Sequence, residues 1–362
     1  MPRPRRLTPP LISLALLVPL LLGLSACTAP VTRRAPLNEQ LVQQEQEKQR
    51  EMAVAYSTRQ YERLYRVGYP LLKAATPLCH ERHRPGFGYL LISRFDFSQE
   101  MRPAATRVFG LDDGLRVHQL LPGGPAERAG LKVGDQLLKV DNFLLGRVEG
   151  EEKRLNQFLK QGTAAAPRRF TVLRGGRPVS LTLQPDVVCD YGLGLVGADE
   201  VNAMADGDNV IVTKGMLRFA ETDQELSLVV AHELAHNTMK HTQAKRTNAA
   251  GGLILDVLAA AAGVNTQGLF QNIAANAYSQ DFEAEADHVG LYIMARAGLP
   301  IEGAANFWRR MAAEHPGSIA TNHAATHPAS AERFVAMEHT VQEIEAKEAR
   351  HQVLLPDIQP QH

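Results

Sequence analysis

Residues 225–236 read Glu-Leu-Ser-Leu-Val-Val-Ala-His-Glu-Leu-Ala-His and contain the pattern His-Glu-x-x-His, formed by His232, Glu233 and His236. The apolar run at 226–231 predicts a buried helix. Because residues four apart lie on one face of a helix, both imidazoles can reach a single ion. This spacing predicts a zinc site beside which Glu233 can take a proton from water. Two ordinary core histidines are the alternative.

A second stretch, residues 281–287, carries acidic side chains on another predicted helix. Glu283 and Asp287 are four residues apart and therefore share a face. Glu283 is the candidate third ligand, and Asp287 can accept a hydrogen bond from a ligating imidazole and fix its orientation. An ordinary solvated acidic face is the alternative. His241 is one residue out of register for the third histidine of a metzincin, so we expect it at the surface or behind a ligand.

The chain has 362 residues, with 39 basic and 39 acidic side chains and a formal net charge of zero. This balance excludes a strong overall attraction to nucleic acid, and we expect no nucleic-acid partner. Three cysteines are too few for a cysteine zinc ribbon, so any metal site has to use His, Asp and Glu.

Residues 1–26 have the parts of a secretory signal peptide, because a basic start precedes an apolar run at 11–24. That run is shorter than the roughly 20 residues that span a bilayer. The sequence Leu-Ser-Ala-Cys ending at Cys27 resembles a bacterial lipobox, which implies a lipid on Cys27 that tethers the protein to a membrane. Thr28 after the cysteine implies sorting to the outer membrane. We therefore expect a periplasmic, lipid-anchored protein with residues 27–37 as its tether.

The two remaining cysteines, Cys79 and Cys189, lie in a compartment that permits disulfides. A bridge between them would close a loop of about 110 residues and restrict the unfolded chain. Two buried free thiols are the alternative, and the sequence favours neither.

The composition divides the rest of the chain into four segments. Residues 38–82 read as one long helix, or as two helices broken near Gly68. Residues 83–187 form a β-rich module punctuated by Gly and Pro. Residues 188–352 are mostly helical apart from a short strand at 210–213, and residues 353–362 are a tail. The expected helices of the third segment cover residues 222–242, 249–264, 268–297, 300–314 and 329–351.

The β-rich module resembles a bacterial PDZ domain. Its hallmarks are Pro125-Ala126, Ala129-Gly130-Leu131 and Gly134-Asp135, and a Gly-Gly turn at 175–176 predicts a hairpin. PDZ domains bind extended peptides, often C-termini, as an added strand. The resemblance implies that residues 88–92 receive the peptide. A module that only spaces or regulates the rest is the alternative.

Together, His232-Glu233-x-x-His236 and Glu283-x-x-x-Asp287 resemble the M48 family of zinc metallopeptidases, here as a periplasmic lipoprotein with an inserted PDZ-like domain. The block around His327 and Arg333 agrees with this family. The resemblance implies an α+β fold: a mostly helical zincin domain of gluzincin type with a short sheet, plus the inserted module. It implies one zinc ion per chain, bound by His232, His236 and Glu283.

The same resemblance assigns roles to the neighbouring residues. Glu233 would be the general base, Asp287 would orient a ligand, and His327 and Arg333 would stabilise the oxyanion. His327 has an alternative role as a cap that keeps the enzyme latent.

The function implied is a zinc endopeptidase of the cell envelope that cleaves unfolded or misassembled proteins. An extended substrate would pair with Val210, Ile211, Val212 and Thr213 as an edge strand. A latent or non-catalytic assembly factor for outer-membrane proteins is the alternative.

Overall fold

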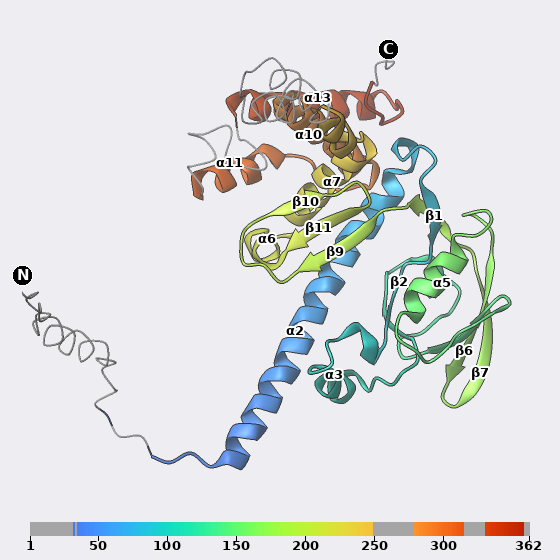
Figure 1. Ribbon diagram of the computed structural model, residues 1–362. Coiled ribbons are helices and arrows are strands. Elements are labelled where there is room, and N and C mark those ends of the chain that lie inside the picture. The colour runs from blue at the N-terminus through green and yellow to red at the C-terminus, as the bar shows by residue number, and fades with distance from the viewer. Residues whose placement is uncertain (1–31, 33–34, 249–278, 315–329, 358–362) are drawn as a thin grey trace, which may run out of the picture. The chain divides into compact units, whose positions relative to one another are not determined.

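The computed structural model describes residues 32, 35–248, 279–314 and 330–357 (Figure 1). The chain divides into two compact units, one ending at Lys48 and the other beginning at Gln49. The expected signal peptide, Cys27, His327 and the helix at 249–264 lie outside the described residues. Among the described helices, none is long and apolar enough to cross a membrane.

Helix α2 (Glu39–Ala74) is a single helix and continues through Gly68 and Pro70 without a break. A proline inside a helix removes one backbone hydrogen bond and strains the preceding turn. Apolar side chains on both sides of Pro70, including Leu64 and Leu72, are fully buried in the main hydrophobic core. Burial of these side chains offsets the local cost, so of the two alternatives for this segment the unbroken helix is the one observed.

The sheet of the helical domain has three strands in the order β10-β11-β9. The central strand β11 pairs with β9 in parallel and with β10 in antiparallel orientation. The prediction that residues 210–213 form a free edge is therefore wrong, because both edges of β11 are hydrogen-bonded. The physical reason is a tight turn at Asp206, which brings β10 beside β11. Oδ1 of Asp206 accepts hydrogen bonds from the backbone N–H groups of Asp208 and Asn209 at 2.8 and 2.7 Å. The strands are β9 (Gly192–Val196), β10 (Ala203–Ala205) and β11 (Asn209–Thr213).

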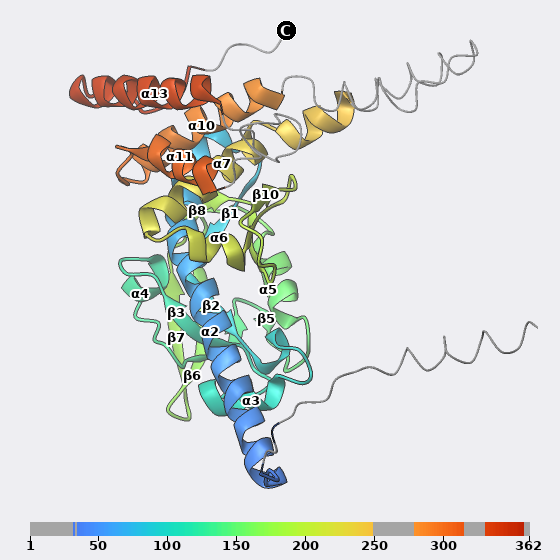
Figure 2. The ribbon, with the colours of Figure 1, turned by 90° about the vertical axis from the view of Figure 1, so that its left-hand side faces the viewer.

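Helices cover this sheet in layers. Helix α7 packs on β10 and β11, α10 packs on α7, and α13 packs on α10 (Figures 1 and 2). Helix α7 begins with a capping box, in which Thr222 and Glu225 satisfy each other's backbone N–H groups. The bounds are α6 (Lys214–Phe219), α7 (Asp223–Thr238), α10 (Ser279–Arg296), α11 (Ala304–Glu314) and α13 (Ala331–Ala349).

Gly290 lets α10 approach α7 closely. A Cβ atom at this position would lie 3.2 Å from the backbone carbon of Ala231 and the backbone nitrogen of His232. The contact distance is tighter than ordinary packing allows, and the obstacle is backbone rather than a flexible side chain. The glycine therefore sets the distance between the two helices that carry the expected metal ligands.

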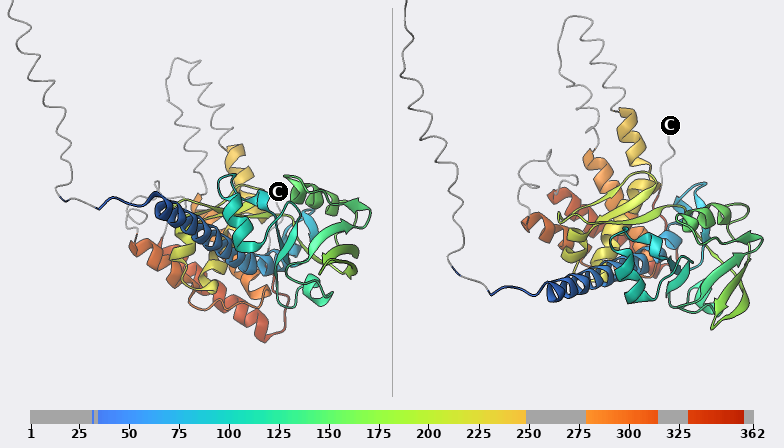
Figure 3. Two further views of the ribbon diagram at one scale, coloured as in Figure 1. Left: turned by 90° about the horizontal axis from the view of Figure 1, so that it is seen from below. Right: turned by 60° about the horizontal axis from the view of Figure 1, so that its bottom comes forward.

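The inserted module has its own hydrophobic core and a sheet in the order β2-β3-β4-β6-β7, with β5 paired to β4. Figure 3 shows the green ribbons of this module from two further sides. The predicted hairpin is confirmed: Gly175 and Gly176, both with positive φ, join β6 and β7. With the helical domain beside it, this module confirms the predicted α+β class. Its strands are β2 (Tyr89–Ile92), β3 (Arg116–Leu120), β4 (Gln136–Val140), β5 (Phe143–Leu144), β6 (Arg168–Arg174) and β7 (Arg177–Leu183), and its helices are α3 (Arg102–Phe109), α4 (Pro125–Arg128) and α5 (Glu151–Leu159).

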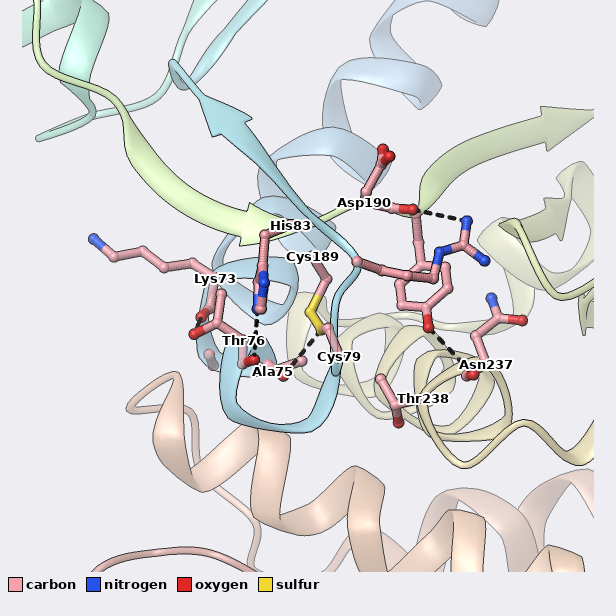
Figure 4. The surroundings of a disulfide bond; sticks show 12 residues. Lys73, Ala75, Thr76, Cys79, His83, Cys189, Asp190, Asn237 and Thr238 are labelled. Carbon is pink, nitrogen blue, oxygen red and sulfur yellow. Dashed lines mark hydrogen bonds between the residues drawn. A yellow bond between two sulfur atoms is a disulfide. The ribbon is translucent and has the colours of Figure 1, made fainter. Parts of the chain in front are cut away.

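A neck of two antiparallel strands, β1 (His83–Gly86) and β8 (Asp186–Cys189), leads into and out of the module. A disulfide between Cys79 and Cys189, with their Cα atoms 5.7 Å apart, closes the base of the neck (Figure 4). Next to Cys189, the Tyr191 hydroxyl donates to the backbone oxygen of Asn237 on α7. The bridge therefore ties the end of the α2 segment to the strand that returns to the helical domain.

Candidate metal centre

Helix α7 directs the rings of His232 and His236 toward one another. Their Nε2 atoms lie 3.2 Å apart, and both side chains are buried. The i, i+4 spacing produces this arrangement, since one turn of helix separates the two Cβ atoms. The Nδ1 atom of each ring contacts another side chain, which leaves the two Nε2 atoms as the pair that can share an ion.

Helix α10 adds the carboxylate of Glu283 to this pair. Its Oε2 lies 3.3 Å from Nε2 of His232 and its Oε1 lies 3.4 Å from Nε2 of His236. The three possible ligand atoms all lie within 4.8 Å of one another, and Glu283 is fully buried. Two imidazoles and a carboxylate that converge in a buried place fit a divalent metal of the zinc type.

Asp287, one turn after Glu283, lies behind His232. Its Oδ1 is 3.0 Å from Nδ1 of His232, while Arg333 on α13 donates to Oδ2 from Nε at 2.8 Å and to Oδ1 from Nη2 at 3.0 Å. Burial opposes a charge on Asp287, but Arg333 and His232 outweigh it and lower the pKa of this carboxyl. The cluster keeps Asp287 ionised and holds the ring of His232 in one orientation.

The two imidazoles have opposite electrostatic environments in the absence of an ion. Burial disfavours a charged His232, but hydrogen bonds and charges from Asp287 and Glu283 prevail and raise its pKa to about 10. Burial dominates at His236 and lowers its pKa to about 4. A bound cation would take the place of the proton that His232 otherwise holds between two carboxylates.

His241 lies behind the second imidazole. Its Nδ1 is 2.9 Å from Nδ1 of His236 and its Nε2 is 2.9 Å from Oε2 of Glu285. His241 is only 1% exposed, so of our two expectations the surface position is wrong and the place behind a ligand is observed. Glu285 was not among the expected site residues; the sequence signal for it is its place in the acidic run at 281–287.

Glu233 is buried on α7 between the two histidines in sequence. It does not share their helix face, which suits a group that acts next to the ion rather than as its ligand. A carboxylate in this position can accept a proton from water and release it to a leaving group.

Arg333, expected to stabilise an oxyanion, contacts both carboxylates of the site. Besides Asp287, its Nη1 lies 3.4 Å from Oε2 of Glu283, and the guanidinium lies 5.6 Å from the ring centre of Trp308. These contacts favour a role in positioning the two carboxylates over direct stabilisation of an oxyanion. His327, the other residue expected to act there, lies outside the described residues.

These features define a class of protein: a metallopeptidase domain with a PDZ domain inserted between its first helix and its sheet. Residues 190–341 match peptidase family M48, and residues 116–174 match the PDZ domain. The chain therefore combines a peptidase M48 domain with a PDZ domain.

The curated relatives are similar to about a third of this chain. The mitochondrial metalloendopeptidase OMA1 of Schizosaccharomyces pombe is 31% identical over 147 residues, which cover 39% of this chain and 43% of that protein. The beta-barrel assembly-enhancing protease of Yersinia pestis is 28% identical over 135 residues, 33% of this chain and 27% of that protein. The corresponding protein of Escherichia coli is 25% identical over 134 residues, with 32% and 27% covered. The chain thus spans less than half the length of these relatives.

Among solved structures, the HtrA-type protease AlgW with a decapeptide covers 29% of this chain and 30% of its own, at 25% identity and a TM-score of 0.23. A likeness of this extent carries no argument about the present protein.

Proposed function

We propose that this protein is a zinc-dependent endopeptidase of the cell envelope. The observation that carries the proposal is the convergence of His232, His236 and Glu283 within 4.8 Å, with Glu233 on the same buried helix as both histidines. Membership of residues 190–341 in a peptidase family supports it. Two imidazoles and a carboxylate that can hold a metal, with a second carboxylate beside them, suit metal-assisted hydrolysis.

A zinc ion held by His232, His236 and Glu283 would supply Lewis acidity, which makes a water molecule more acidic and a peptide carbonyl more electrophilic. Glu233 then takes the proton from the attacking water and later delivers it to the departing amine. Asp287 and His241 keep the two imidazoles oriented throughout, because each contacts an Nδ1 atom.

The substrate strand that we now propose is β10 rather than β11. Among the described residues β10 pairs with β11 alone, so its other edge can accept an extended chain. Helix α7 packs directly on β10. Recognition through main-chain hydrogen bonds places few demands on side chains, so we expect unfolded polypeptides as substrates.

The envelope location rests on the signal peptide and lipobox at Cys27, outside the described residues. We propose a lipid-anchored protein of the outer membrane that faces the periplasm. Relatives named beta-barrel assembly-enhancing proteases support outer-membrane proteins as clients. The disulfide between Cys79 and Cys189 is consistent with an oxidising compartment.

The test is the substitution Glu233→Gln in the purified mature protein. We expect this variant to bind one equivalent of zinc and to have the same midpoint of urea unfolding as the wild type. Its rate of casein cleavage should fall by about 100-fold or more. Glu348→Gln, an exposed glutamate of α13, is the matched control and should cleave casein normally. Wild-type cleavage by Glu233→Gln would refute the proposal.

The same variant separates the enzyme from an assembly factor that only holds clients. In cells that lack the wild-type protein, Glu233→Gln should fail to restore the envelope function. Full restoration by this variant would show that the protein acts without catalysis.

A further inference from the structure

Strand β10 is bonded to β11 along one edge and, in the part of the chain that the structure describes, has no partner strand along the other. The carbonyl of Asn202, just before the strand, and the N–H of Asp206, just after it, both bond to β11, at 3.1 and 3.2 Å. Because residues of an antiparallel pair alternate between bonded and unbonded positions, Ala203 and Ala205 direct their N–H and C=O groups to the other edge. A substrate strand can use these backbone groups.

The hydroxyl of Thr242 satisfies one of these backbone groups. Its Oγ1 donates to the carbonyl oxygen of Ala205 at 3.3 Å. This contact is independent support for the direction of that carbonyl, which faces away from β11. The N–H and C=O of Ala203 and the N–H of Ala205 are the groups left for a further strand. A side chain thus closes the edge of β10 at the end next to the tight turn.

A change of chain direction after α7 brings Thr242 to this place. Lys240 has a φ of +58°, in the left-handed region that residues other than glycine seldom adopt, and it separates α7 from the helical segment 241–248. His241, at the start of this segment, is buried and contacts Nδ1 of His236. Thr242 follows it directly and is half-buried. The contacts of its neighbour therefore hold Thr242 against β10.

Asn237, the residue after His236, fastens the same end of the sheet to α7. Its Oδ1 accepts a hydrogen bond from the N–H of Gly207 at 2.8 Å, and its Nδ2 donates to the carbonyl of Asn209 at 2.9 Å. Gly207 lies in the turn between β10 and β11. The closed end of the edge is therefore fixed relative to His236, and so is the limit that Thr242 sets on a strand bound there.

We propose that Thr242 determines where a substrate strand ends on β10. An extended polypeptide bonds to Ala203 and to the N–H of Ala205, but gains little from the carbonyl of Ala205, because the hydroxyl of Thr242 already satisfies it. The inference deepens the proposed endopeptidase function and rests on it. Substrate residues beyond this point add no affinity, so the length of substrate that the enzyme senses on one side of the metal ligands is fixed.

The test uses two series of alanine peptides that carry a hydroxamate group, which binds zinc. The group is at the C-terminus in one series and is joined to the N-terminus through a succinyl spacer in the other. Each series is lengthened from one to six residues. Calorimetric titration of the zinc-loaded mature chain with Glu233→Gln gives the dissociation constant at each length without cleavage of the probe. We expect the affinity to stop rising in one series at the residue that faces Ala205.

Thr242→Val, added to Glu233→Gln, keeps the shape of the side chain but removes its hydroxyl and so frees the carbonyl of Ala205. In the same series, one further residue should now lower the dissociation constant by about 3- to 10-fold, while shorter peptides bind as before. A general structural defect would instead change the affinity at every length. Thr242→Ser retains a hydroxyl and should keep the limit on length.

Thr247→Val is the matched control. Thr247 is an exposed threonine of the same helical segment, and its hydroxyl donates to the carbonyl of Gln243 rather than to a strand. Its replacement should leave the dependence of affinity on length unchanged. The same limit on length in Thr242→Val as in the protein with Thr242, or a further gain with length in Thr247→Val, would overturn the proposal.

Failure of this inference is distinguishable from failure of the proposed function. An unchanged limit on length in Thr242→Val, together with zinc-dependent casein cleavage by the wild type, would refute the role of Thr242 alone. The additional gain in Thr242→Val without any casein cleavage by the wild type would refute the endopeptidase alone. An affinity that does not depend on length in either series would refute the pairing with β10, whether or not casein is cleaved.

Discussion

Nδ1 of His236 lies 2.9 Å from Nδ1 of His241, so one of these two nitrogens donates a proton and the other accepts it. If Nε2 of His236 binds a metal, its Nδ1 carries the proton and donates to His241. Nε2 of His241 then carries a proton as well and donates to Glu285 at 2.9 Å. The relay fixes the tautomer of His236 through two residues outside the ligand set.

This relay predicts that His241→Phe weakens zinc binding by about 10- to 100-fold, because His236 loses its acceptor. Phenylalanine retains an aromatic ring next to Phe282, on which His241 stacks. Competition with a chromophoric chelator measures the affinity. Glu285→Gln keeps an oxygen acceptor and should change the affinity by about threefold or less. Wild-type affinity in His241→Phe would show that the relay has no effect on the metal.

Asp287→Asn should destabilise the metal-free protein by about 3 to 5 kcal/mol, because Arg333 then remains buried with its principal partner neutralised. Urea unfolding in the presence of chelator measures this loss. The control is Asp223→Asn, which breaks the pairs with Arg63 and Arg66 at a position where Asp223 is half exposed. The control should lose about 1 kcal/mol or less. Equal losses in the two variants would contradict the prediction.

The carboxyl of Glu152 on helix α5 should make the free energy of unfolding depend on pH. Burial, together with the charge of Asp96, raises its pKa from 4.5 to about 7. Between these two values the folded protein holds the proton more firmly than the unfolded chain, so the free energy of unfolding falls as pH rises. Above pH 7 the full cost of a buried charge is present.

The substitution Glu152→Gln removes that cost. Relative to wild type, its free energy of unfolding should rise between pH 5 and pH 8 by about 1 kcal/mol, since water reaches this half-buried carboxyl and screens its charge. Urea unfolding at the two pH values measures the difference. Glu149→Gln, an exposed glutamate nearby, should show the same difference from wild type at both values. A pH-independent effect of Glu152→Gln would refute the assignment.

Reduction of the bridge between Cys79 and Cys189 should lower stability by as much as about 4 to 5 kcal/mol, because the unfolded chain regains the freedom of a loop of 110 residues. Thermal unfolding with and without a phosphine reductant measures the effect. The double variant Cys79→Ser with Cys189→Ser should resemble the reduced wild type and should not respond to reductant. If the reductant shifts the unfolding temperature of the double variant, its effect does not come from this disulfide.

Local periodicity explains which parts of the site could be predicted from the sequence. Helix spacing places His232 and His236 on one face of α7, whereas the convergence of Glu283, on α10, was expected from the family resemblance. The structure brings these three side chains together. The position of Asp287 relative to Glu283 follows from helix spacing. Helix spacing does not predict the position of Arg333. The side of the carboxylates that Arg333 contacts depends on how α13 packs on α10.

Sheet order also depended on information that a local pattern lacks. The β-branched run at 210–213 correctly predicted a strand, but β10 is only three residues long and contains alanine and methionine. A local pattern that does not identify β10 and β9 predicts an edge strand where the structure has the central one. The pairing of Cys79 with Cys189 was equally undecided, because it requires the neck formed by β1 and β8.

The bridge at the base of the neck has a consequence for damage by other proteases. The exposed loop between β5 and α5 lies inside the segment that Cys79 and Cys189 enclose. A nick there would sever the polypeptide into two pieces, one with α2 and the other with the metal-binding helices. The disulfide keeps these two pieces in one molecule, which separates on a gel only after reduction. A cut in the inserted module therefore leaves α2 joined to the helices that carry His232, His236 and Glu283.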